Sequence, residues 1–223
     1  MLMLVDVTGK VMVWDTHGED MIVKFNERVL TNEVNDIAWD ARNEKFMVVG
    51  TGSNLYGKAF TIDGSSAGEA YPKPPIDANG KVTGHTGLTG TVVINAVAIS
   101  PNPITSSLPS RAVTVGDDHQ MGFYRGPRYK WVTSCKQHTA FVYDAAFSPD
   151  GKTIVTVGAD RKINLFDGED GSFKESFDGP THTGSIFSVG WDATGCRIVT
   201  ASADRTVKLW DVATKSIVQY CSF

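Results

Sequence analysis

The sequence predicts an all-β fold, a β-propeller with four complete four-stranded blades and one incomplete N-terminal blade. Two observations lead to this prediction. The C-terminal half of the chain repeats itself with a period of about 44 residues. Each repeat contains short runs of β-branched and aromatic residues separated by turn residues. Four short antiparallel strands in a repeat of this length are typical of a propeller blade, which buries its faces against its neighbours.

The repeat is clearest near the C-terminus, where residues 141–167 and 186–211 align almost residue for residue. Both units end in an aromatic residue followed by aspartate. Similar unit ends occur upstream at Phe123-Tyr124, Ile62-Asp63 and Trp14-Asp15. The interval between the ends at 63 and 124 is longer than the others because residues 71–80 form a Pro/Gly-rich insertion, which we expect to be a surface loop.

These unit ends divide a single domain, residues 1–223, into blades. We expect the blades at approximately residues 1–33 (partial), 34–91, 92–140, 141–185 and 186–223. The first five residues already have the pattern of a second strand, so the first blade lacks its innermost strand. Because propellers close their rings to remove exposed strand edges, we expect the chain to be a fragment of a longer protein.

Composition and charge exclude several classes of function. The net charge is −4 and no block of like charge occurs, so neither nucleic acid nor an anionic membrane is an expected partner. The three cysteines are widely spaced and include no C-x-x-C pair, which argues against a disulfide framework or a zinc site. The apolar N-terminal stretch is too short for a signal peptide or a membrane span. We expect a cytoplasmic protein without metal, cofactor or small-molecule substrate.

Recurring landmarks resemble those of the WD-repeat family. A histidine precedes the first strand of three units, at Gly84-His85, Gln137-His138 and Thr181-His182, and the Trp-Asp dipeptide that names the family occurs at 14–15 and 210–211. The resemblance implies a buried hydrogen-bond relay from this histidine to a Ser or Thr at the end of the second strand, an Asp in the next turn and a Trp in the third strand. The last unit carries it as His182, Ser202, Asp204 and Trp210.

Two other units have an incomplete relay by the same alignment. One keeps His138 and Asp160 but has Gly158 and Phe166 in place of Ser and Trp, and the other keeps His85 and Asp118. We therefore expect packing to stabilise these blades. Buried imidazole and indole N–H groups need hydrogen-bond partners, so the residues of the relay are expected to be structural.

Two enzyme-like patterns have structural explanations. His182, Ser202 and Asp204 have the residue types of a hydrolase triad, but the repeat places the same His and Asp in blades without the serine. Residues 52–59 nearly spell a phosphate-binding P-loop. However, Ala59 has no hydroxyl for Mg²⁺, and the residues that follow predict a strand where a helix N-terminus is required. We expect no catalytic residues.

A closer resemblance covers almost the whole chain. The segments D-V-T-G-K-V-M-V-W-D-T at 6–16, G-D-D-H-Q-M-G-F-Y-R-G-P-R-Y-K-W at 116–131 and H-T-A-F-V at 138–142 are similar to the first propeller of the actin-interacting protein 1 family. The resemblance implies a non-catalytic protein of the cytoplasm and cytoskeleton. Such a protein binds actin filaments together with cofilin, the actin-depolymerising factor, and promotes their severing and disassembly.

The resemblance also implies a partner-binding patch, which falls on Asp117, Lys130, Trp131, Phe141 and Asn54. Trp131 replaces a phenylalanine of the family and keeps a large aromatic anchor. Asn54 replaces a glutamate and loses a charge. Considered without the family, Tyr129 and Trp131 alternate to one face of a strand, which makes the space between blades an equal alternative for Trp131. His119 is expected to be exposed and without a role.

A second class of function stays open, that of a generic WD-repeat scaffold, for example in a ciliary or regulatory assembly, which keeps the repeats without an actin site. Substitution of the patch distinguishes the two, because it abolishes filament disassembly only under the first hypothesis.

Overall fold

The computed structural model describes residues 2–6, 8–16, 18, 20–30, 32–52, 55–62, 66–72, 84–86, 91–101, 109–177 and 181–223. Within these ranges all regular secondary structure consists of β-strands, which confirms the predicted all-β class. None of the described residues belongs to a helix long and apolar enough to cross a membrane.

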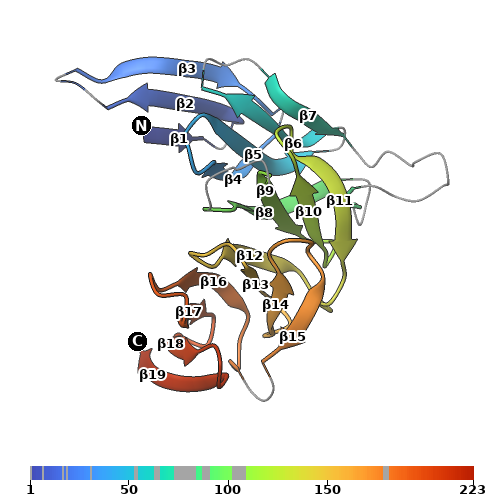
Figure 1. Cartoon of the computed structure of the whole chain (residues 1–223), viewed down its shortest axis with the longest axis vertical. Helices are drawn as coiled ribbons and strands as arrows, with labels where there is room; N and C mark the ends of the chain where they lie inside the picture. Colours follow the sequence, from blue (N-terminus) through green and yellow to red (C-terminus); the bar gives the residue numbers. More distant parts are fainter. Residues whose placement is uncertain are drawn as a thin grey trace.

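The strands form successive antiparallel blades arranged in an arc, with both chain ends on its open side (Figure 1). Blade 1 contains β1 (Leu2–Val5), β2 (Lys10–Asp15) and β3 (Ile22–Arg28). Blade 2 contains β4 (Val34–Trp39), β5 (Lys45–Gly52), β6 (Leu55–Thr61) and β7 (Ser66–Pro72). Blade 3 contains β8 (Val92–Ile99), β9 (Arg111–Gly116), β10 (Met121–Arg125) and β11 (Lys130–Cys135). Blade 4 contains β12 (Val142–Phe147), β13 (Thr153–Gly158), β14 (Ile163–Asp167) and β15 (Phe173–Ser176). Blade 5 contains β16 (Ile186–Trp191), β17 (Arg197–Ser202), β18 (Thr206–Asp211) and β19 (Ser216–Ser222).

Within blades 2 to 5 each strand pairs with the next along the chain, and the first strand of each blade lies on the inner side of the arc (Figure 1). A short pairing of β5 with β8, at Thr51 with Val93 and Gly52 with Val92, joins blades 2 and 3 into one sheet. The strands of blades 2 to 5 span residues 34–72, 92–135, 142–176 and 186–222. The insertion at 71–80 lies outside the described residues except for Tyr71 and Pro72, which end β7.

The hydrophobic core is divided among the boundaries between blades. Four separate apolar clusters lie between blades 1 and 2, 2 and 3, 3 and 4, and 4 and 5. The largest fully buried side chains come from these clusters and include Phe46, Met47, Phe123, Tyr124 and Phe166. Neighbouring blades therefore stabilise one another, and blades 2, 3 and 4 each pack against two neighbours, as in other repeat proteins.

Polar contacts also join neighbouring blades through their innermost strands. One carboxylate oxygen of Asp36 in β4 accepts a hydrogen bond from the backbone N–H of Val97 in β8, at 2.8 Å. Asp144 in β12 accepts from Val189 in β16 in the same way, at 2.9 Å. Burial raises the pKa of Asp36 to about 6 against the effect of its backbone N–H donors, and the charge of Asp144 adds to the increase.

A second contact joins blades 3 and 4 at the other end of the strands. The guanidinium of Arg111 in β9 is buried and donates to the carbonyls of Gly151 and Gly168, at 3.2 and 2.7 Å. It also donates to the hydroxyl of Ser100 at 3.0 Å. Burying a guanidinium group costs free energy unless the group is hydrogen-bonded. These bonds offset that cost and connect blade 3 to blade 4.

Candidate functional site

The relay in blade 5 connects four side chains, and its hydroxyl belongs to Thr200. Nδ1 of His182 lies 2.9 Å from the carboxylate of Asp204. Nε2 of His182 lies 2.8 Å from the hydroxyl of Thr200, which also accepts a hydrogen bond from the indole N–H of Trp210 at 2.9 Å. The assignment of Ser202 to this relay is therefore a prediction that the structure corrects.

Ser202 makes a different set of bonds. Its hydroxyl donates to the carbonyl of Gly184 at 3.1 Å and accepts from the backbone N–H of Asp204 at 3.2 Å. Thr200 and Ser202 point to the same face of β17 because they are two residues apart. The imidazole contacts Thr200, which is the more deeply buried of the two.

The same correction restores a relay in the two blades where the sequence predicted its loss. In blade 4, His138 lies 3.0 Å from Asp160 and 2.7 Å from the hydroxyl of Thr156. In blade 3, His85 lies 3.0 Å from Asp118 and 2.7 Å from the hydroxyl of Thr114. That threonine donates in turn to the hydroxyl of Tyr124 at 3.1 Å, so a tyrosine takes the place of the tryptophan in blade 3.

The relay carboxylates are ionised and held inside the fold. Burial alone would raise the pKa of Asp160, but hydrogen bonds from His138 and from the backbone N–H groups of Thr139 and Lys162 lower it to about 2. The pKa of Asp204 is lowered further below its usual value, against the effect of burial, by bonds from Thr206, Thr183 and His182. For His182, burial lowers the pKa and favours the neutral imidazole.

This geometry assigns the relay a structural role. Thr200, which stands between His182 and Trp210, is only 1% exposed, so a substrate has no access to the hydroxyl that contacts the imidazole. Among the described residues, no group of three or more His, Cys, Asp or Glu side chains is arranged to hold a metal ion.

Two of the sequence-predicted patch residues share one face of the molecule. The upper face is defined here as the end of the blades where the innermost strands begin and where the turn between the second and third strands lies. Asp117 occupies this turn in blade 3, and its carboxylate accepts a hydrogen bond from Asn95 at 2.9 Å. Phe141 directly precedes β12 and is 38% exposed, with its ring 5.9 Å from that of His119.

Lys130 lies at the opposite end of blade 3, which we call the lower face. In the β10–β11 pair, Lys130 is opposite Arg125 at the hairpin, whereas Met121, next to the turn of Asp117, is opposite Cys135. Five residues of strand separate the two ends, roughly 15 Å at the usual rise per residue. The structure therefore does not bring Lys130 together with Asp117 and Phe141.

Trp131 packs inside the array. Its ring makes edge contacts with Tyr124 and His85, with centroid distances of 5.2 and 5.7 Å, and it packs on the cluster between blades 2 and 3. A Cβ at Gly122 would lie 2.6 Å from the indole, so this glycine makes room for the ring. Tyr129 is fully buried in the same cluster. Of the two alternatives for Trp131, this packing favours the space between blades. Asn54 lies outside the described residues.

Sequence reasoning missed two positions that recur on the upper face. The residue after each relay aspartate has a positive φ, and it is His119 (67°), Arg161 (66°) or Arg205 (64°). Near the start of the innermost strands of blades 2 to 5, one residue is the extra residue of a β-bulge, and it is Asn35, Asn95, Tyr143 or Phe187. The alignment of the repeats could have identified the first position, because each of its residues directly follows a relay aspartate.

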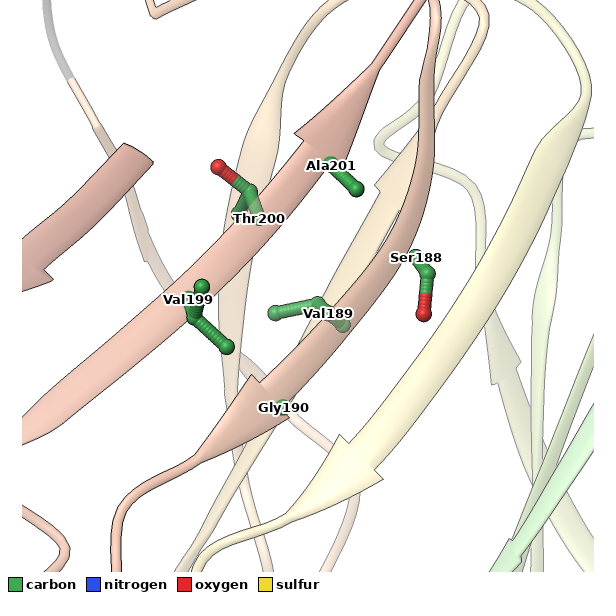
Figure 2. Close-up of a pocket in the computed structure, with 6 residues that line it drawn as sticks. All are labelled: Ser188, Val189, Gly190, Val199, Thr200 and Ala201. Carbon is green, nitrogen blue, oxygen red and sulfur yellow. The ribbon is translucent and has the colours of Figure 1, made fainter. Parts of the chain in front are cut away.

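A pocket of about 200 Å³ lies on blade 5, and few polar groups line it. Figure 2 shows its lining, Ser188, Val189 and Gly190 on β16 beside Val199, Thr200 and Ala201 on β17. The hydroxyl of Ser188 already donates to Asp144 at 2.8 Å, and that of Thr200 belongs to the relay. The pocket is therefore mostly aliphatic and offers little to orient a polar ligand.

Comparison with known proteins gives the class of this chain. The family described as WD domain, G-beta repeat matches residues 129–167 and 171–211, which cover β11 to β18. Together with the antiparallel four-stranded blades, this match shows that the chain is a WD-repeat protein.

Individual curated proteins with similar sequences show which WD-repeat proteins this chain resembles. WD repeat-containing protein 1 of Bos taurus is 35% identical over 167 residues, 74% of this chain. An uncharacterised WD repeat-containing protein of Schizosaccharomyces pombe is also 35% identical over that length, and the 66 kDa stress protein of Physarum polycephalum is 32% identical. The chain is therefore homologous to WD repeat-containing protein 1, and the alignment spans 24% of the length of each of these relatives.

Proposed function

We propose that this chain is a non-catalytic binding module of the cytoplasm and cytoskeleton that binds actin filaments together with cofilin and promotes their severing and disassembly. Support comes from its homology to WD repeat-containing protein 1, the group to which actin-interacting protein 1 belongs. The motifs at 116–131 and 138–142 support the same relationship. WD-repeat proteins are generally scaffolds that act through binding, and the described relays are closed hydrogen-bond networks.

The observation that carries the proposal is the pair formed by Phe141 and Asp117 on the upper face. A phenylalanine that is 38% exposed lies beside a carboxylate, and both are held on the rigid ends of neighbouring blades. The amide of Asn95 bonds both to Asp117 and to the carbonyl of Val142, next to Phe141, at 2.9 and 2.8 Å. An aromatic anchor with an adjacent charge is the usual centre of a protein interface.

Disassembly requires no bond chemistry in this scheme. A protein that binds a distorted, cofilin-bearing filament more tightly than a regular one shifts the filament population towards the distorted form. The interface then acts by its difference in affinity for the two filament states, and the blades provide a rigid support for it.

The test is actin cosedimentation with and without cofilin, comparing Phe141→Ala with Phe173→Ala. Both phenylalanines are 38% exposed, but Phe173 lies on β15, the outermost strand of blade 4. We expect the unmodified chain and Phe173→Ala to increase the actin left in the supernatant when cofilin is present, and Phe141→Ala to lose most of this effect. If the unmodified chain leaves the sedimented fraction unchanged, the proposed function is wrong.

A generic WD-repeat scaffold is the second candidate, and one observation favours it. Lys130 lies on the lower face, so the residues implied by the family do not form one surface. Under the actin hypothesis Lys130 needs a separate filament contact, and Lys130→Ala then reduces disassembly. Under the scaffold hypothesis neither Lys130→Ala nor Phe141→Ala changes the sedimented actin. Trp131→Ala is a poor choice, because it removes packing between blades.

A further inference from the structure

Aromatic rings continue from Phe141 across the upper face of blades 3 to 5, with Phe141 and Phe187 exposed and His119 and Tyr143 half-buried. The ring of His119 lies 5.9 Å from that of Phe141, and Tyr143 lies 5.3 Å from Phe187. Phe141 and Tyr143 flank Val142 at the start of β12, so the four rings follow one another from blade to blade. We call this set, His119, Phe141, Tyr143 and Phe187, the upper aromatic strip.

The β-bulges explain why two of these rings point outwards. In blades 2 and 3 the bulge residues are Asn35 and Asn95, and each donates to a backbone carbonyl of the following blade at 2.8 Å. In blades 4 and 5 the same position holds Tyr143 and Phe187. In these two blades an aromatic side chain thus takes the place of the asparagine amide that joins neighbouring blades, and Phe187 is 53% exposed. Bulges of this kind often re-aim a side chain beside a functional site.

Two arginines flank the strip at strained positions. Arg161 and Arg205 follow the relay aspartates of blades 4 and 5 with φ of 66° and 64°. This conformation is unfavourable for residues with a Cβ and easy for glycine. Both arginines are exposed, and their side chains make no hydrogen bond or ion pair with another described residue.

At the blade 4 and 5 turns the charge next to the strip is positive, whereas Asp117 places one carboxylate at its blade 3 end. Arg161 is close to Phe141, because the backbone N–H of Ala159 in the same turn donates to the carbonyl of Phe141 at 2.8 Å. The neighbouring carboxylates of Asp160 and Asp204 bond to the relay histidines, and only 3% and 8% of these side chains is exposed. The outward-facing charges of both turns therefore come from the arginines.

We propose that the upper aromatic strip, with Arg161 and Arg205, binds an acidic polypeptide segment that carries an apolar or aromatic side chain. The apolar side chain packs on Tyr143 and its neighbours, while the guanidinium groups pair with carboxylates of the segment. This inference rests on the proposed function in one respect, since it assigns the segment to the cofilin-bearing filament. Substitution of Tyr143 tests this proposal most clearly, because Tyr143 lies on blade 4, between blades 3 and 5.

The first experiment measures binding of the chain to cofilin-decorated filaments by cosedimentation. The variants are Tyr143→Ala and the double variant Arg161→Glu/Arg205→Glu. Their controls are Phe173→Ala and Arg128→Glu, the same substitution at one exposed residue of the lower-face turn, with half the charge change of the double variant. We expect Tyr143→Ala to weaken binding about fivefold and the double variant about tenfold. We expect the double variant also to lose the salt dependence of binding and the controls to bind within about twofold of the unmodified chain. Circular dichroism melts identify any variant that fails to fold.

The second experiment tests the chemistry of the strip without actin. Fluorescence anisotropy measures binding of a labelled glutamate-rich peptide with a central tryptophan, against the same peptide with glutamine in place of glutamate. We expect the unmodified chain to bind the acidic peptide more tightly and the arginine double variant to lose this preference. If the unmodified chain binds filaments but the strip variants bind equally well, the strip is not the site. If it binds neither filaments nor the acidic peptide, the inference is wrong whatever the function of the protein.

Discussion

Replacing Thr200 with valine tests the relay of blade 5 most sharply, because valine keeps the shape of threonine and removes only the hydroxyl. With neutral His182, the indole N–H of Trp210 donates to Thr200, the hydroxyl donates to Nε2, and Nδ1–H donates to Asp204. Thr200→Val leaves a buried indole N–H and a buried imidazole nitrogen without partners. Each such loss costs about 1–3 kcal/mol, so we expect the free energy of unfolding to fall by about 2–6 kcal/mol.

Urea unfolding followed by tryptophan fluorescence measures this change, with Ser202→Ala as the matched control. The hydroxyl of Ser202 lies two residues away on the same strand and bonds to backbone groups of Gly184 and Asp204. We expect the control to cost about 1 kcal/mol and Thr200→Ser to be nearly neutral. If Ser202→Ala costs as much as Thr200→Val, the relay does not pass through Thr200.

Three further predictions follow from the packing of the blades. Arg111→Met removes the donors to two carbonyls of blade 4 and should lower the free energy of unfolding by about 2–3 kcal/mol, whereas Arg128→Met at an exposed turn should be neutral in the same urea titration. Tyr124→Phe removes the partner of the blade 3 threonine and should cost about 1 kcal/mol, and a change below the error of a thermal melt would contradict this. Burial lowers the pKa of His182, so its contribution to stability is present above its ordinary pKa of 6.5 and is lost as the pH falls through its folded-state pKa. The stability cost of His182→Gln should therefore shrink between about pH 7 and about pH 5, and a constant cost would contradict the neutral, buried imidazole.

Much of the fold followed from the repeats because a blade has one strand pattern and one set of landmarks. The aromatic-Asp unit ends and the histidines before the first strands predicted an all-β fold of four-stranded blades, and the described strands confirm that class. The relay hydroxyl was less accessible to sequence reasoning. Thr200 and Ser202 both carry a hydroxyl and lie on the same side of β17. Only the depth at which the imidazole lies decides which of the two hydroxyls it contacts.

The same choice explains why two relays were missed. Thr114 and Thr156 stand at the position of Thr200, and Thr156 lies two residues before Gly158, which the alignment compared with Ser202. A motif that is matched two residues too far along makes a network appear to lack its hydroxyl. In blade 3, the substitution of tyrosine for tryptophan hid the relay further, although the tyrosine hydroxyl also contacts the threonine.

The candidate patch was less predictable because it combines residues from different turns. Asp117 and Lys130 are thirteen positions apart in the sequence, but β10 separates the turns that hold them and places them on opposite faces. The bulges at Tyr143 and Phe187 leave no signature of their own in a single strand. Their outward direction depends on how two neighbouring blades meet, which the order of residues alone does not specify.

The most direct test of the account is hydroxyl-radical footprinting of the chain bound to cofilin-decorated actin filaments. Binding through the upper face predicts protection of the turn at 116–119 and of residues 139–143 and 159–161, with the hairpin at 125–130 less protected. Protection confined to the 125–130 hairpin, or a footprint identical to that of the free chain, would contradict it.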